Sequence, residues 1–307
     1  MRTDQPEPGD TPGSTRHPPP SRDQATPQTP APPSRAEQLT AHDNYRATVA
    51  ATERAARTSG DQATWSQALP GLRAAWNEHK HRYPQHPPAE PRTEPDGSWA
   101  SGQHRTLNPD QNTEAAKARA DLTDQATQRL LPALRRIEAA NPQRNLAGLQ
   151  HMIKSEDRLK EKLADFLRAP GVTVTDALNE VPDAIRYTFR YSVDQYSSGV
   201  VADVARLKEA GFELIKLKNL WQAEQYKGIN SQWRVPESQS RFELQFHTPE
   251  SLEAKELTHE AYERVRGELV TSAEERELRD YQRHVNVFVH IPPGTDQIKD
   301  FPEQRDA

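Results

Sequence analysis

The chain has 307 residues, of which 33% are hydrophobic and 28% charged, and its formal net charge is -5. A chain this polar, with 26 prolines, cannot form one hydrophobic core along its whole length. We therefore expect the apolar residues to be concentrated in one part of the chain. The absence of cysteine excludes disulfides and Cys-type metal sites. The acidic balance argues against dedicated nucleic-acid binding. No apolar run reaches the ~18 residues of a membrane span.

The N-terminal region is rich in proline and poor in aliphatic residues. Residues 1–36 hold ten of the 26 prolines, which predicts a disordered arm. The first residues contain no apolar segment of the Sec signal type, so we expect a cytoplasmic protein, with export by a non-Sec route as the alternative. Residues 37–82 are Ala-rich and predict a helical hairpin, in which Pro70 kinks or breaks the second helix. Residues 83–111 return to a Pro-rich linker.

The remaining sequence predicts a compact domain over 112–270 and a C-terminal helix and tail over 271–307. A leading helix covers 112–145, with Pro132 disrupting it, and an amphipathic helix follows at 153–168. Alternating β-formers predict strands at 185–191, 212–221, 229–235 and 241–247, and the segment 286–291 is a candidate short strand. Helices are expected at 200–211, ending on Gly211, and from Pro249 to 266. This order predicts an α+β fold with a mixed sheet of about five strands against helices.

The strand RFELQFH at 241–247 is the first candidate for chemistry. Side chains alternate between faces, so Glu243, Gln245 and His247 share one face and the apolar side chains share the other. A carboxylate, an amide and an imidazole together suit the floor of a site. The alternative is the polar outer face of a half-exposed sheet, which is the commoner case.

A carboxylate at the start of the strand 185–191 is the second candidate. Asp183 precedes this strand and Arg186 lies in it. Paired with Glu243, Asp183 has the ligand chemistry for Mg²⁺, which takes one or two carboxylates plus phosphate oxygens. Alone, it is equally a turn residue.

Two further segments carry cations near aromatic or amide groups. In the helix 153–168, Lys154, Arg158 and Lys162 recur at every fourth residue, as a phosphate-binding stripe or as a salt-bridged exposed face. The run QYKGIN places Tyr226, a lysine and an asparagine in one loop, suited to a nucleobase and a phosphate, although Lys-Gly loops between strands are common.

These segments, in this order, resemble the RelA/SpoT-type nucleotide pyrophosphokinase domain over residues 146–266. The matching stretches are IKSEDRLKEK, PDAIRYTF, QYKGIN, FELQFHT and HEAY. The sequence DAIRYTF…YKGIN…FELQFHTPES is especially similar to that of actinobacterial ATP:nucleotide 3'-pyrophosphokinases. The resemblance implies a synthetase-like, nucleotidyltransferase-related sheet, ATP and a purine nucleotide as partners, and Mg²⁺ as cofactor. It implies no hydrolase half, because the sequence lacks that half's His-Asp cluster.

The resemblance also implies a role for each matching residue. Asp183 and Glu243 would coordinate Mg²⁺ and form the catalytic pair. The remaining roles fall into three groups: ATP binding by Lys154, Arg158, Lys162 and Arg186; acceptor binding by Tyr226, Lys227, Asn230, Gln245 and His247; and site support by His259 and Tyr262.

Departures from the family pattern concern the acceptor. Asn230 stands where the family has a loop histidine, His247 where it has an arginine, and Gln225 where a glycine precedes the tyrosine. Guanine and adenine acceptors therefore both stay open. Three other readings stay open as well: a toxin effector with the same chemistry, which would bring an immunity or delivery partner; a nucleotide-binding module without turnover; and a scaffold. A homo-oligomer is compatible with all of them.

Overall fold

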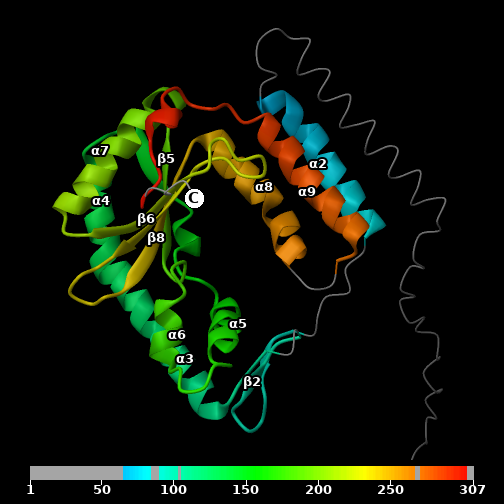
Figure 1. Cartoon of the computed structure of the whole chain (residues 1–307), viewed down its shortest axis with the longest axis vertical. Helices are drawn as coiled ribbons and strands as arrows, with labels where there is room; N and C mark the ends of the chain where they lie inside the picture. Colours follow the sequence, from blue (N-terminus) through cyan, green and yellow to red (C-terminus); the bar gives the residue numbers. More distant parts are fainter. Residues whose placement is uncertain (1–64, 84–89, 103–104, 267–269, 303–307) are drawn as a thin grey trace, which may run out of the picture.

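The computed structural model describes residues 65–83, 90–102, 105–266 and 270–302. The predicted arm, the first helix of the hairpin and the last residues of the tail lie outside this part of the chain. Within the described residues the protein has an α+β fold, in which helices pack on both faces of a five-stranded mixed sheet (Figure 1). The predicted fold class is therefore confirmed.

The main sheet has the strand order β4-β5-β8-β7-β6. β5 and β8 pair in parallel, and the other neighbours are antiparallel. The strands are β4 (Arg144–Ala147), β5 (Arg186–Tyr191), β6 (Glu213–Asn219), β7 (Ile229–Arg234) and β8 (Arg241–His247).

Four of the five strands lie where the alternation predicted them, and the fifth does not. The segment 286–291 is not a strand, because the helix α9 (Ser272–Val287) runs into it. The fifth strand is β4, an edge strand whose buried Arg144 pairs with Asp203 at 2.8 Å. A buried arginine in a polar segment gives no strand periodicity, so the pattern of single residues could not identify β4.

Alternation gives the sheet one aromatic face and one polar face. Tyr187, Phe189 and Tyr191 of β5 share one face, where Phe189 and Tyr191 lie beside Phe246 of β8. The helices α4 (Leu131–Ala139) and α7 (Tyr196–Glu209) lie on this side of the sheet (Figure 1). The Tyr191 hydroxyl donates to Asp203 of α7 at 2.7 Å. Gly211 ends α7 in the left-handed region, as predicted, with φ 89°. The other face carries Arg186 and Glu243, which are paired in register, and α8 (Pro249–Arg266) packs there.

The predicted leading helix is continuous but not uniform. α3 (Pro109–Asp124) passes through a π-helical turn (Gln125–Leu130) into α4. Pro132 lies in the first turn of α4, where its missing N–H removes one interior hydrogen bond. The Tyr187 hydroxyl donates to the Ala126 carbonyl within the π turn, which fixes the helix to the sheet at 2.8 Å.

Shorter elements complete the domain around α5 (Glu156–Phe166) and α6 (Val174–Asn179). Leu159 and Leu163 of α5 are buried as the amphipathic pattern predicted, but Phe166 is 37% exposed. The predicted linker contains an antiparallel sheet that packs on α5: Trp99 donates to Asp157 at 3.0 Å. Its strands are β1 (Arg92–Thr93), β2 (Trp99–Ala100) and β3 (Thr106–Leu107), and 3-10 turns cover Leu149–His151, Val193–Gln195 and Thr295–Gln297.

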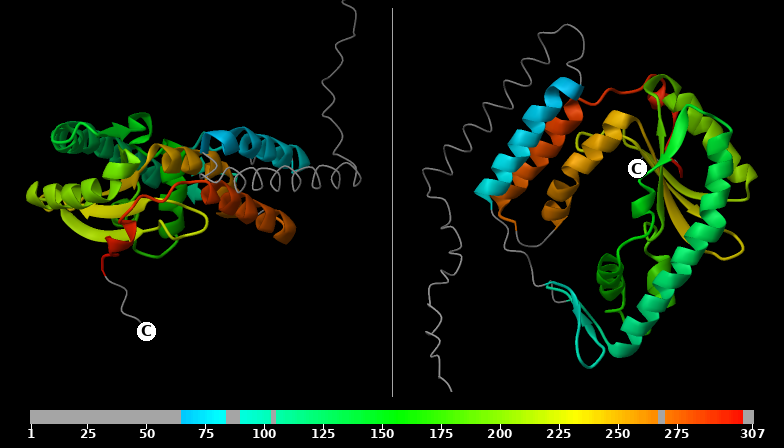
Figure 2. Two further views of the ribbon diagram at one scale, coloured as in Figure 1. Left: turned by 90° about the horizontal axis from the view of Figure 1, so that it is seen from above. Right: turned by 180° about the vertical axis from the view of Figure 1, so that it is seen from behind.

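The second helix of the predicted hairpin, α2 (Trp65–Arg82), packs beside α8 and α9 (Figures 1 and 2). It continues through Pro70. Trp65 and Trp76 donate their indole N–H groups to Glu253 and Glu260 of α8, at 2.7 and 3.1 Å. Among the described residues, no helix combines the length and the apolar character that crossing a membrane requires.

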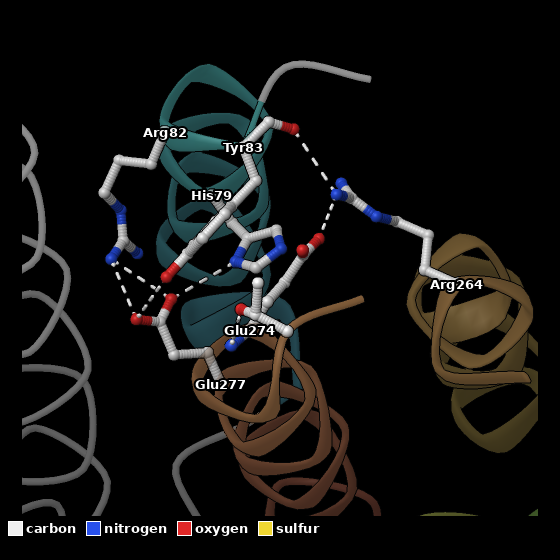
Figure 3. Close-up of polar contacts among 7 residues, drawn as sticks. His79, Arg82, Tyr83, Arg264, Glu274 and Glu277 are labelled. Carbon is white, nitrogen blue, oxygen red and sulfur yellow. Dashed lines mark hydrogen bonds and ion pairs between the residues drawn. The ribbon is translucent and has the colours of Figure 1, made fainter. Parts of the chain in front are cut away.

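A buried polar cluster joins the ends of these three helices (Figure 3). Glu277 of α9 accepts from Arg82 at 3.2 Å and from the Tyr83 hydroxyl at 3.3 Å, and its other oxygen lies 3.4 Å from Nδ1 of His79. Arg264 of α8 pairs with Glu274 of α9. We call these six residues the α2–α9 cluster: His79, Arg82, Tyr83, Arg264, Glu274 and Glu277.

Candidate active site

A cleft of about 640 Å³ lies between α5, α8 and the polar face of the sheet. It is lined by all thirteen sequence-predicted site residues except Lys227 and His247. The chain brings these residues together from segments more than a hundred positions apart, because β5 and β8 are parallel neighbours in the centre of the sheet. Their starting ends carry Asp183 and Glu243 to the same side of the cleft.

The two predicted metal ligands, Asp183 and Glu243, form the floor of the cleft. Asp183 accepts from Nζ of Lys154 at 2.7 Å. Burial raises the pKa of the Glu243 carboxyl, and the negative charge of Asp183 raises it further. Because the negative charges of the two carboxylates repel each other, a cation bound by both is favoured.

The donor chemistry fits Mg²⁺, although it forms no complete cage. Among the described residues, no group of three or more His, Asp or Glu side chains converges as a metal site. Mg²⁺ is commonly held by one or two carboxylates and completed by substrate phosphates and waters. Asp183 and Glu243 supply such a pair in a cleft that is also lined by lysine and arginine side chains.

The predicted helical stripe of cations is only partly helical. Lys154 precedes α5, in a segment bridged to β5 by its N–H bond to the Ala184 carbonyl at 3.0 Å. The expectation that it lies on the helix was wrong, since Ser155 is the residue at which α5 begins to form. Its ammonium nevertheless reaches the cleft, where Arg158 and Lys162 of α5 also lie. Burial lowers the pKa of Lys162, and the charge of Arg266 lowers it further.

The loop before β7 places Tyr226 and Asn230 at the other end of the cleft. The Tyr226 hydroxyl bonds to Asn230 at 2.7 Å and to Nε2 of His247 at 2.9 Å, while the ring stays partly exposed. Gly228 permits this packing, since its φ is 149° and a Cβ there would lie 2.8 Å from the imidazole of His247. The exposed part of the ring is therefore fixed in orientation and available for stacking.

Lys227 and His247 are placed behind the cleft and not in its lining. Nζ of Lys227 donates to the Trp221 carbonyl at 2.9 Å, which closes the loop on itself. His247 is completely buried and bonds Ser251 as well as Tyr226. Burial lowers its pKa well below the usual value, so the imidazole is neutral. The structure thus shows both residues as supports of the loop.

One face of α8 lines the cleft with four side chains at helical spacing: Lys255, His259, Tyr262 and Arg266. The sequence analysis identified His259 and Tyr262 but missed Lys255 and Arg266. Their positions, four residues before and seven after His259, are the signal that could have found them. Arg266 donates to the Tyr262 hydroxyl at 2.9 Å and lies over its ring.

Further lining residues come from segments that the sequence analysis did not single out. Arg105, beside β3, lines the cleft and pairs with Asp165 of α5 at 2.7 Å. Arg158 bridges the two walls of the cleft, because it lies 3.1 Å from Glu161 of α5 and 3.4 Å from Glu263 of α8. Cations therefore surround the carboxylate floor, which suits a polyanion bound together with a divalent cation.

No protein-family model matches the sequence, and neither does any curated protein. Among solved structures, the chain is similar to the small alarmone synthetase 1 of Bacillus subtilis bound to its product pppGpp, at 12% identity and TM-score 0.38 over 53% of this chain and 87% of that one. It is also similar to the small alarmone synthetase 2 of Bacillus subtilis (15%, TM-score 0.36, 56% and 90%). A third neighbour is a GTP pyrophosphokinase family protein of Streptococcus pneumoniae (16%, TM-score 0.34, 58% and 85%).

These neighbours carry the names of the synthetase family that the sequence motifs resemble. Their low identities and TM-scores leave the function to be argued from the cleft itself. The special similarity to actinobacterial enzymes stays a prediction.

Proposed function

We propose that the protein transfers the β,γ-pyrophosphoryl group of ATP to the 3'-hydroxyl of a purine nucleotide and releases AMP. The observation that carries the proposal is the Asp183–Glu243 floor, enclosed with Lys154, Arg158, Lys162 and Arg186 in one cleft. A triphosphate and a divalent cation together need such a set of charges. The cleft volume of about 640 Å³ is also within the range of ligand sites, about 300–1,000 Å³.

Donor binding falls to the cations on α5 and at the start of the sheet. Lys154 lies beside Asp183 and Arg186 is paired in register with Glu243, so phosphates bound to them lie over the carboxylate floor. Arg158 and Lys162 extend this positive surface along α5. Asp183 and Glu243 would hold Mg²⁺, which supplies charge neutralisation at the phosphoryl oxygens.

Transfer requires the 3'-oxygen of the acceptor to attack the β-phosphorus. The new bond joins that oxygen to the β-phosphorus, and the bond from the β-phosphorus to the bridging oxygen of the α-phosphate breaks, so AMP leaves with its electron pair. Glu243 accepts the proton of the hydroxyl. Burial raises the pKa of this carboxyl, which makes it a better proton acceptor than an exposed glutamate. The chain otherwise works by positioning and by electrostatics.

The acceptor base is assigned to the end of the cleft that holds Tyr226. Its ring is fixed through the hydroxyl and presents an exposed part for stacking on either purine. Asn230 and Gln245 line the same end; Asn230 offers its amide nitrogen to the acceptor, while the Gln245 amide bonds Glu243 and Lys255. This pattern recognises a purine nucleotide without separating guanine from adenine.

A direct test uses Mg²⁺, γ-labelled ATP and a panel of AMP, ADP, ATP, GDP and GTP as acceptors. The wild type is expected to give a labelled 3'-pyrophosphorylated nucleotide, and Glu243→Gln to give none while keeping the wild-type melting profile. Glu256→Gln is the matched control, because the same change there affects an exposed residue of α8. Equal conversion by wild type and Glu243→Gln would refute the role of Glu243.

The biological use of the reaction is a separate question. A toxin that depletes ATP has the same chemistry as a housekeeping synthetase. Growth arrest on expression, relieved by Asp183→Asn, would support the toxin role, whereas growth unaffected by the active protein would count against it.

A further inference from the structure

Lys255 is a partly buried cation that the proposed mechanism does not use. It lies on the cleft face of α8, and its Nζ donates to Oε1 of Gln245 at 2.6 Å. Gln245 in turn donates from Nε2 to Oε1 of Glu243 at 2.5 Å. An ammonium on one helix is thus connected through one amide to the proposed proton acceptor on the central strand.

The chemistry of the three groups fixes the direction of this chain of hydrogen bonds. An ammonium has only donors, so the amide must turn its oxygen toward Lys255. The amide nitrogen then faces Glu243, where it donates to one carboxylate oxygen. If the ammonium were absent, the amide oxygen would lose its donor, and the side chain would be free to rotate away from the carboxylate. Lys255 therefore holds the Gln245 amide in the position from which it donates to Glu243.

The surroundings of Lys255 make an ammonium unfavourable at this position. Burial and the nearby positive charge of Arg186 lower the pKa of Lys255 to about 8. An apolar side chain would avoid this loss of solvation. Lys255 thus lowers the stability of the fold but completes the hydrogen bonds from Lys255 through Gln245 to Glu243. Such a residue is characteristic of a functional site.

We propose that Lys255 is a positioning residue that orients the Gln245 amide and, through it, the Glu243 carboxylate for proton transfer. The proposal rests on the proposed function. One carboxylate oxygen is held by the amide, and the other is left for the acceptor hydroxyl or a bound cation. Because Lys255 belongs to α8, the same contact ties this helix to the floor of the cleft.

The test measures kcat and KM for ATP in Lys255→Met, Lys255→Arg, Gln245→Leu and the double variant Lys255→Met/Gln245→Leu. Loss of a contact that orients a reactive group typically lowers activity by about 10- to 100-fold. We expect Lys255→Met to lower kcat by this factor and to change KM less than about threefold, since Lys255 acts on a reactive group and not on ATP. Lys255→Arg, which keeps donors only, should recover part of kcat.

Coupling between the two positions separates a relay from two independent effects. In a relay, both single changes remove the same orientation, so the double variant should be no slower than the slower single variant. If the kcat loss of the double variant equalled the product of the two single losses, the proposal would be overturned. A raised KM for ATP in Lys255→Met at unchanged kcat would also overturn it, because Lys255 would then be a phosphate ligand. Lys208→Met, an exposed lysine of α7, is the control and should leave kcat unchanged.

A crystal structure of Lys255→Met keeps the inference separate from the proposed function. If the wild type transfers nothing to any acceptor, the proposed function fails, and the structure decides the relay alone. The relay predicts that the Gln245 amide turns away from Glu243, whereas an unchanged amide overturns it. If Lys255→Met does not fold, Lys255→Arg is crystallised and assayed instead. The proposal is overturned if the Gln245 amide of this variant points away from Glu243 while the variant keeps the kcat of wild type.

Discussion

Charged side chains gather in the cleft and in the α2–α9 cluster, and one contact in the cleft is of a different kind. In the cluster, acids and bases meet directly: Arg264 with Glu274, and Arg82 with Glu277. In the cleft, Lys154 also meets Asp183 directly, but Lys255 is connected to Glu243 through the amide of Gln245. Direct pairing neutralises both charges and joins helices. Pairing through an amide holds both groups in place while keeping their charges available to a ligand.

This difference predicts that changes in the cleft affect activity and changes in the cluster affect folding. The largest expected effect is at the cleft floor. Asp183→Asn removes one of the two carboxylates and the partner of Lys154. Loss of one preorganised electrostatic group in an active site lowers kcat by about 100- to 1,000-fold. We therefore expect Asp183→Asn to lower kcat by at least about 1,000-fold. Steady-state transfer assays measure kcat, and titration calorimetry with Mn²⁺ should show weaker metal binding.

Asp165→Asn is the matched control for this experiment. Asp165 lines the same cleft and pairs with Arg105 at 2.7 Å. A change there is expected to lower kcat less than about tenfold, or about 1.4 kcal/mol. Equal losses in the two variants would show that the general charge of the cleft, and not the Asp183–Glu243 pair, carries the reaction.

The α2–α9 cluster should respond in stability. Glu277→Gln removes the carboxylate charge that Arg82 and His79 share, in a side chain only 16% exposed. Breaking one partner of a buried ion pair costs about 3 kcal/mol of unfolding free energy. Urea unfolding measures this loss, and the kcat of the folded variant should stay within twofold of wild type, because the cluster lies outside the cleft lining.

The same substitution two residues away on α9 supplies the contrast. Glu275→Gln breaks an exposed pair with Arg279, in which both side chains are more than 40% exposed. Exposed pairs contribute about 0–1 kcal/mol, so we expect little change in unfolding free energy. If both glutamates give the same small loss, the buried cluster does not fasten the helices.

A smaller effect is expected from His247, which supports the acceptor loop. Burial holds its pKa well below the usual value of about 6.5. Below that pH the unfolded chain binds a proton that the folded chain does not, so the unfolding free energy falls as pH drops. One such group gives at most about 1.4 kcal/mol per pH unit. Between pH 7 and pH 5, the unfolding free energy should therefore fall more with pH in wild type than in His247→Asn. An equal fall in both proteins would contradict a neutral buried imidazole.

The smallest effect is expected at the exposed link between α2 and α8. Arg73 pairs with Glu253 at 3.0 Å, and the arginine side chain is 61% exposed. Arg73→Ala should lower the unfolding free energy by less than about 0.5 kcal/mol, because solvent already screens the pair. A loss as large as that of Glu277→Gln would mean that exposed contacts, and not burial, hold α2 in place.

The parts of the fold that follow a simple period could be predicted from the sequence. The alternation in 241–247 gives β8 its polar and apolar faces as expected, and Pro249 and Gly211 mark helix ends correctly. The strands β1 to β3 have only two residues each and lie among prolines, so they show no period. β4 depends on the contact of Arg144 with Asp203, which local sequence does not contain.

The candidate site shows the same division. Asp183 precedes one predicted strand and Glu243 lies in another, so the sequence could suggest the pair, but only the parallel pairing of β5 with β8 brings them to one cleft. Lys255 lies in the run EAKEL, where a lysine between glutamates is typical of a solvated helix face. Only the packing of α8 against β8 shows that it reaches Gln245. Lys227 looked like a phosphate ligand, but its contact with the Trp221 carbonyl depends on a loop geometry that composition does not reveal.

The reaction proposed for the cleft is transfer of a pyrophosphoryl group and not of a single phosphoryl group. Phosphorus NMR of a reaction with ATP and an accepting purine nucleotide distinguishes the two. Pyrophosphoryl transfer predicts that AMP and a nucleotide bearing a 3'-diphosphate appear in equal amounts. Accumulation of ADP, or of AMP with free pyrophosphate and no modified acceptor, would contradict it.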